Sequence, residues 1–229
     1  NDLVLDPDNK ARRGLVLVAS GAQGESIEGF GVRMGLSFLD TKGVQFEEAK
    51  LNWGHHIRQK IDDWRKETSE GSFTYDVLGA IGWLFPDPNS IYQLGEARLV
   101  PLSTQDGDYN ADDMGGYQVL LNFRNGDITH SFHTISLQSV LKNSVPPNFF
   151  KNRLVFIGSK APSLNDNFPT PYNSTLKSTA AELMPGVGIH ATIASQVISG
   201  ALDGRPLLRT SSKLLNWFLI LRSEEHTSE

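Results

Sequence analysis

Three residues that could bind a small ligand lie in a loop that follows a short apolar run. The run 153–157 (RLVFI) has the composition of an interior β-strand. Ligands of layered α/β proteins collect at the carboxyl ends of strands, so we expect a pocket where this run ends. The loop behind it supplies a carboxylate and two hydroxyls, on Asp166, Ser159 and Thr170. Turn formation explains Asp166 and Thr170 equally well, because Asp and Thr-Pro commonly shape turns.

Charged and titratable residues elsewhere offer a second set of candidate ligand contacts. His190 stands near the expected start of a helix, where it could hydrogen-bond a ligand or titrate as a pH sensor. A satisfied interior histidine is the more common role at such a position. Arg12 and Arg13 could bind a carboxylate or a phosphate, but an ion pair with Asp6 or Asp8 in the same turn is favoured.

Other kinds of chemistry are not indicated. The pairs His55-His56 and His130 with His133 lack the geometry to hold one metal ion without further ligands. No P-loop, no G-x-S-x-G elbow and no HExxH sequence occurs, and the chain has no cysteine. We therefore predict no metal site, no cofactor and no catalytic residues.

Composition limits the class of protein. With 229 residues, 39% of them hydrophobic and 21% charged, the chain can bury one substantial core. Its 21 basic and 26 acidic residues give a net charge of −5, which does not attract nucleic acid. Nucleic acid is therefore excluded as an expected partner.

The expected elements alternate between strands and helices. The strands are predicted at 14–19, 117–123 and 153–157, with a short hairpin from 91–94 and 98–102. The helices are predicted at 25–39, 134–141 and 188–198, and a further helical insertion at 52–89. This order predicts a layered α/β domain with a mixed β-sheet flanked by helices.

The end of the chain carries two segments that we separate from the domain. Residues 213–221 include an apolar run about half as long as the ~20 residues of a membrane span, and we interpret them as the truncated start of a transmembrane helix. An amphipathic helix packed on the domain is the alternative. Residues 222–229 (RSEEHTSE) read as a translated sequencing adapter and are excluded from fold reasoning.

Several short motifs, in this order, resemble the CHASE2 extracellular sensory domain. An acidic turn, Asp6-Pro7-Asp8-Asn9, precedes the basic pair Arg12-Arg13 and a strand. Later matches are Asn122-Phe123-Arg124, the segment from Phe132 to Leu141, Phe156-Ile157-Gly158 with Ala161, Asp166 and Thr170-Pro171, then Pro185-Gly186-Val187 with Ile189-His190-Ala191, and Gly204-Arg205-Pro206. The sequence departs from the family pattern at Gly188, where a carboxylate is common, and in a longer segment from His55 to Pro88.

The resemblance implies a domain at 1–208 whose N-terminal part is missing, because the acidic turn normally lies well inside such domains. It further implies a sensor on the periplasmic or extracellular side of a cell membrane, ahead of transmembrane helices and a cytoplasmic cyclase, kinase or diguanylate cyclase. The expected partners are an unknown small ligand or an envelope protein, the membrane through the C-terminal helix, and by analogy a second copy in a homodimer.

Two other functions stay open at this point. The first is a periplasmic hydrolase in which Asp166 and His190 act as an acid/base pair beside Ser159 as the nucleophile. The second is a surface scaffold for protein interactions, for which an exposed apolar patch would replace a ligand cavity.

Overall fold

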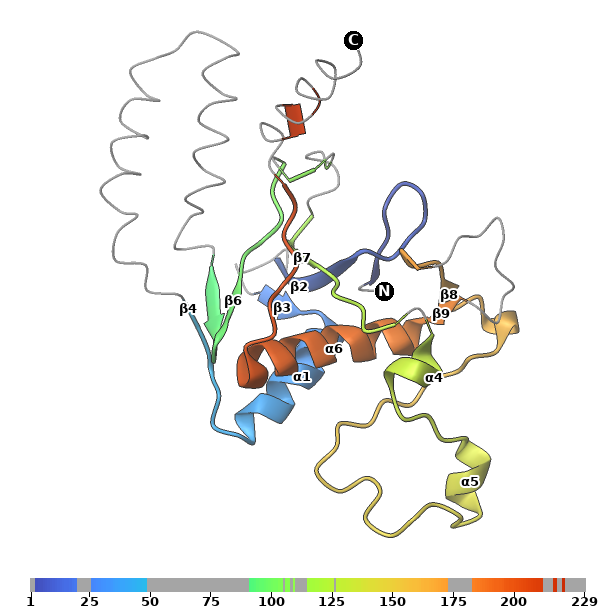
Figure 1. Cartoon of the computed structure of the whole chain (residues 1–229). Helices are drawn as coiled ribbons and strands as arrows, with labels where there is room; N and C mark the ends of the chain where they lie inside the picture. The colour runs from blue at the N-terminus through green and yellow to red at the C-terminus, as the bar shows by residue number, and fades with distance from the viewer. Residues whose placement is uncertain are drawn as a thin grey trace, which may run out of the picture.

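The computed structural model describes residues 3–19, 26–48, 91–104, 106–107, 109, 115–125, 127–172, 183–211, 216–217 and 220 (Figure 1). The predicted helical insertion at 52–89 lies outside the described residues. So do the segment 222–229 and most of the predicted membrane helix at 213–221. Within the described part, no helix has both the length and the apolar character needed to cross a membrane.

Strand β2 is the centre of the main sheet. It pairs antiparallel with three strands, and the bounds are β1 (Leu3–Val4), β2 (Arg13–Ala19), β3 (Ser26–Glu28) and β7 (Tyr117–Leu120). The strand predicted at 14–19 is confirmed, and the one predicted at 117–123 is shorter. The prediction of a mixed sheet is wrong, because every strand pair among the described residues is antiparallel.

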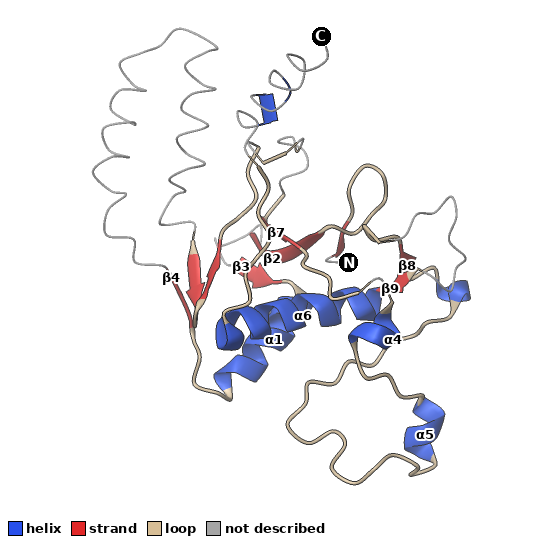
Figure 2. Cartoon of the chain, viewed as in Figure 1, coloured by secondary structure: helices blue, strands red, loops and turns tan. Residues whose placement is uncertain are grey.

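Helices α1 (Phe30–Asp40) and α6 (Gly186–Asp203) pack side by side against one face of this sheet (Figures 1 and 2). Small residues allow this close approach. A Cβ atom on Gly31 would lie 2.7 Å from the His190 carbonyl oxygen and 2.8 Å from the Ile193 Cβ. Ile193 also meets the sheet, where a Cβ on Gly14 would lie 3.2 Å from its Cγ1. Gly31 of α1 therefore packs directly against α6.

A small antiparallel sheet lies at the C-terminal end of α6. It consists of β4 (Phe46–Glu48), β5 (Tyr92–Leu94) and β6 (Ala97–Leu99). The predicted hairpin is confirmed, with Gly95-Glu96 as its two-residue turn. Gly95 has a φ of +57°, and the backbone N–H of Glu96 donates to the Ala201 carbonyl. This bond fixes the hairpin to the last turns of α6.

The remaining elements are short. They are α4 (Ile128–Ser131), α5 (Leu137–Leu141), a 3₁₀ turn at Pro162–Leu164, and the pair β8 (Asn167–Phe168) and β9 (Met184–Pro185). Side-chain caps define both short helices. Asp127 accepts from the Thr129 N–H at 2.7 Å, and Ser136 Oγ accepts from the Ser139 N–H at 3.1 Å. The helix predicted at 134–141 is thus confirmed but begins later, at its serine cap.

The interior strand predicted at 153–157 is wrong. These residues form no strand, and Ile157 is 89% exposed. From Leu154 to Lys160, no backbone N–H or C=O bonds another described residue through the backbone. Apolar β-branched composition favours a strand, but a strand also needs a neighbour to pair with, and composition cannot supply one.

Candidate functional site

The loop predicted to bind a ligand closes over the N-terminal end of α6. The backbone N–H of Gly186, the first residue of the helix, donates to the Asp166 carbonyl at 2.9 Å. The Asp166 carboxylate lies against the Cα of Gly186, where any Cβ atom would clash with it. A carboxylate at this end of a helix is stabilised by the helix dipole. Asp166 thus explains why residue 186 is glycine.

The two hydroxyls of this loop bond nearby backbone. Ser159 Oγ accepts from the Ala161 N–H at 3.0 Å, and Thr170 Oγ1 accepts from the Tyr172 N–H at 3.3 Å. Thr170 is fully buried. Both therefore make local turn contacts, which is the alternative role that the sequence offered for Thr170.

His190 belongs to an aromatic cluster with Phe30 and Phe156. Its ring meets Phe30 edge-to-face with centroids 5.1 Å apart, and Phe30 meets Phe156 in the same way at 5.8 Å. Ser159 and Asp166 make no hydrogen bond or ion pair with His190. The structure therefore does not join the three groups into the constellation that a hydrolase would need.

A surface depression lies in a different part of the chain from the expected pocket. It measures about 400 Å³ and is open to solvent. Its walls come from the segment 140–151, and they are Val140, Asn143, Val145, Pro146, Asn148, Phe149, Phe150 and Lys151. This places the depression before the 153–157 run rather than beyond its carboxyl end.

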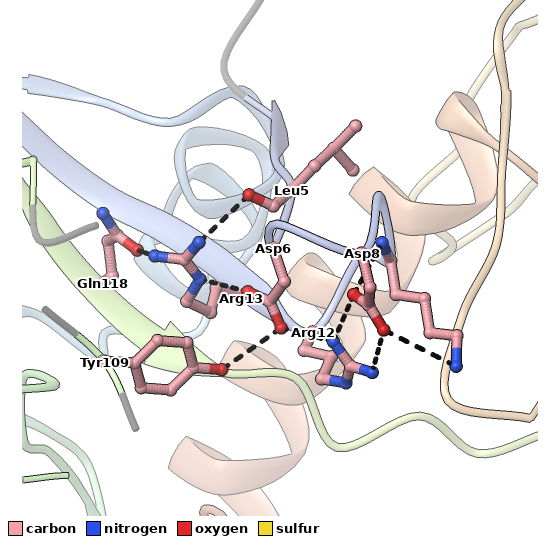
Figure 3. Close-up of polar contacts among 8 residues, drawn as sticks. Leu5, Asp6, Asp8, Arg12, Arg13, Tyr109 and Gln118 are labelled. Carbon is pink, nitrogen blue, oxygen red and sulfur yellow. Dashed lines mark hydrogen bonds and ion pairs between the residues drawn. The ribbon is translucent and has the colours of Figure 1, made fainter. Parts of the chain in front are cut away.

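Arg12 and Arg13 are held by carboxylates of the preceding turn (Figure 3). Arg12 bonds both oxygens of Asp8 at 2.7 Å and Asp6 Oδ2 at 2.6 Å. Arg13 is 2% exposed, and its Nε bonds Asp6 Oδ1 at 2.6 Å. Its other nitrogens donate to Gln118 Oε1 and the Leu5 carbonyl, both at 3.0 Å. The ion-pair geometry is the one favoured from the sequence.

This cluster, Asp6 with Asp8, Arg12 and Arg13, also perturbs the groups around it. The hydrogen bonds from Arg12 hold the pKa of Asp8 well below its usual range. Tyr109 donates to Asp6 Oδ2 at 3.4 Å, and its ring lies 4.8 Å from the Arg13 guanidinium carbon. Burial, and then the negative charge of Asp6, raise the pKa of Tyr109 to about 12.

Asn122 forms a junction that sequence reasoning did not propose as a site. Its backbone N–H donates to Gln196 Oε1 of α6 at 2.7 Å, and its Nδ2 donates to the Pro206 carbonyl at 3.2 Å. Arg205 Nη2 donates to two oxygens of Asn122, the backbone carbonyl at 3.1 Å and Oδ1 at 3.0 Å. Burial, and then the charge of Arg124, lower the pKa of Arg205. Asn122 and Arg205 both belong to motifs that resemble the CHASE2 family. That resemblance was the sequence feature that could have indicated this junction.

We call residues 204–211 the exit segment, because they carry the chain away from α6. Asn122 holds its beginning, and Asp106 holds its end. Asp106 Oδ1 accepts from Thr210 Oγ1, while its Oδ2 accepts from the Ser103 N–H at 2.7 Å. The backbone around Asp106 leads directly to Tyr109, which bonds Asp6. The exit segment is therefore connected to α6, to β7 and to the Arg13 cluster.

Comparison with known proteins gives one family. The model of the CHASE2 domain matches residues 1–222 of the 229-residue chain. The searches of curated proteins and of solved structures gave no match. CHASE2 domains are non-catalytic sensory domains found in signalling proteins. Because the match covers nearly the whole sequence, and the family motifs meet at the Asn122 junction, the chain belongs to the CHASE2 domain family.

Proposed function

We propose that this chain is the extracytoplasmic, ligand-sensing input domain of a membrane-bound signal-transduction protein and has no catalytic activity of its own. The observation that carries the proposal is the match of a sensory family over residues 1–222. The membrane-bound context and the ligand are part of the proposal. An output module on the cytoplasmic side would be a cyclase, a kinase or a diguanylate cyclase.

The exit segment is the proposed route of the signal. A ligand or an envelope partner that binds one arrangement of the domain more tightly than another shifts the population toward it. The exit segment responds because its first residues are bonded to α6 and β7 through Asn122, and its last residues to Asp106. A change in how α6 packs would therefore reach residue 211 through hydrogen bonds rather than through a loose linker.

The hydrolase function has less support. Ser159 Oγ is engaged by the Ala161 N–H, and the Asp166 carboxylate lies over the start of α6. Neither bonds His190, whose ring packs against Phe30. General acid/base catalysis needs these groups within hydrogen-bond reach of one another or of a shared reacting atom.

The proposed coupling is tested by replacing Asn122 in the intact signalling protein. We expect Asn122→Ala to change the basal activity of the output module by about fivefold or more, in line with a coupling energy of about 1 kcal/mol or above. The control is Gln138→Ala, which removes an exposed amide from α5 that makes no hydrogen bond to a described residue. Equal output from both variants, with both folded by circular dichroism, would sink the proposed coupling.

A further inference from the structure

Residues 128–165 form what we call the basic lobe, in which α5 and the loop that follows it lie below the two long helices in Figure 1. This stretch contains Lys142, Lys151, Arg153 and Lys160 and no aspartate or glutamate, although the whole chain has a net charge of −5. All four cations are exposed, and none forms an ion pair with a described residue. The lobe is therefore a positive surface on an acidic protein.

Within this lobe, the segment 154–157 shows the exposure pattern of a strand, although it pairs with no described strand. Leu154 and Phe156 are half-buried, whereas Val155 and Ile157 are 43% and 89% exposed. Exposure that alternates with a period of two is that of an extended chain. Phe156 fixes the inner face of the segment through its contact with Phe30 of α1. The segment is thus held in place through Phe156, while its backbone groups make no backbone hydrogen bond to a described residue.

We propose that residues 153–160 bind a partner β-strand that alternates apolar side chains and carries carboxylates at both ends. Main-chain hydrogen bonds to the unpaired backbone would supply affinity, as they do when a peptide adds to the edge of a sheet. Val155 and Ile157 would pair with apolar side chains of the partner. Lys151 and Arg153 at one end, and Lys160 at the other, select an acidic strand. The proposal stands apart from the ligand of the sensory function.

Two other occupants fit less well. A second copy of this segment, paired antiparallel over its whole length, would place Arg153 of one copy opposite Lys160 of the other, which is unfavourable. An anionic lipid surface is disfavoured on the proposed function, because the exit segment would lead to the membrane. Figure 1 shows the exit segment and α5 at opposite ends of the molecule.

The test uses two labelled peptides and the purified 229-residue chain. Both peptides alternate valine and threonine, and their ends carry either glutamate or lysine. Measured by fluorescence anisotropy, the affinity of the glutamate peptide should exceed that of the lysine peptide by about tenfold or more. The affinity of the glutamate peptide should fall when the salt concentration is raised to about 0.5 M. Hydrogen exchange should show new protection at 154–160. Ile157→Pro should abolish binding, because proline lacks the N–H that a ladder needs.

The matched control is Leu208→Ala, an exposed apolar residue outside the lobe, which should bind the glutamate peptide as the unaltered chain does. Equal affinity for the two peptides would overturn the proposal, as would protection elsewhere than 154–160. Binding of phosphatidylglycerol vesicles without binding of the glutamate peptide would assign the lobe to a lipid surface instead. Protection of 154–160 that rises with chain concentration alone would assign it to self-association.

Discussion

At the scale of single residues, Arg13 and Asp6 form the most buried ion pair among the described residues. Arg13 is 2% and Asp6 6% exposed, and the guanidinium also bonds Gln118 and the Leu5 carbonyl. A buried carboxylate that loses its partner keeps the cost of desolvation without the compensating attraction. The pair therefore has a larger effect when broken than an exposed pair of the same chemistry.

Arg13→Ala should lower the free energy of unfolding by up to about 3 kcal/mol, because Asp6 stays buried and keeps only Arg12 as a cation partner. The matched control is Arg33→Ala, which removes an ion pair with Glu28 in which Arg33 is 65% exposed. That change should cost less than about 1 kcal/mol. Urea unfolding of both variants measures the difference, and similar losses would contradict the account of the cluster.

The free energy of unfolding should depend on pH in the alkaline range, because Tyr109 titrates there. Its pKa is raised from 10.0 to about 12 in the folded chain, chiefly by burial. Because the folded state holds the proton more tightly, this contribution is complete below pH 10 and is lost as the pH rises through about 12. The decline in the urea midpoint between these pH values should be smaller in Tyr109→Phe. Burial raises the pKa of Tyr117 too, so some decline should persist. Identical pH profiles would refute the role of Tyr109.

The roles of individual residues could be predicted only where the partners are close in sequence. Arg12 and Asp8 are four residues apart, so their ion pair could be anticipated from the turn itself. Asn122 and Arg205 are 83 residues apart. Their contact depends on the packing of α6 against the sheet, and no local pattern encodes that packing.

At the scale of elements, the contact between α1 and α6 depends on glycine. Gly31 faces a backbone carbonyl of α6, and a side chain there would force the two helices apart. In an exposed helix, replacing glycine by alanine is stabilising, since it reduces the entropy lost on folding. The close approach reverses that expectation at this position.

Gly31→Ala should therefore lower the free energy of unfolding by about 1 to 3 kcal/mol, as overpacking does. Ser37→Ala, on the exposed face of the same helix, should change it by less than about 0.5 kcal/mol. Thermal or urea unfolding of the two variants provides the comparison. A Gly31→Ala chain as stable as the unaltered one would show that the helices are not packed as closely as described.

Pairing between elements explains which of them could be predicted from the sequence. The runs at 14–19 and 153–157 have similar composition, but only the first has strands on both sides to pair with. Helical periodicity predicted α6 because its buried positions recur along one long element. The start of α1 was misplaced because residues 26–28 pair with β2 before the helix begins. Pairing is a tertiary property, and it decided each of these outcomes.

At the scale of the whole molecule, two hydrogen-bonded routes connect the start of the chain to the exit segment. The Arg13 cluster reaches Tyr109, the backbone beside it reaches Asp106, and Asp106 reaches Thr210. Asn122 gives a second connection, through α6 and β7. Both routes end before residue 212, which is where a sensory input domain would pass its signal onward.

The location of this domain is the central claim, and cysteine labelling in whole cells tests it most directly. The chain has no cysteine, so Gln138→Cys in the intact protein places one thiol at an exposed position outside the proposed strand-binding segment. A version of the intact protein without other cysteines serves as the background. The account predicts labelling by a membrane-impermeant maleimide in unbroken cells. Labelling only after the cells are lysed would contradict an extracytoplasmic sensor.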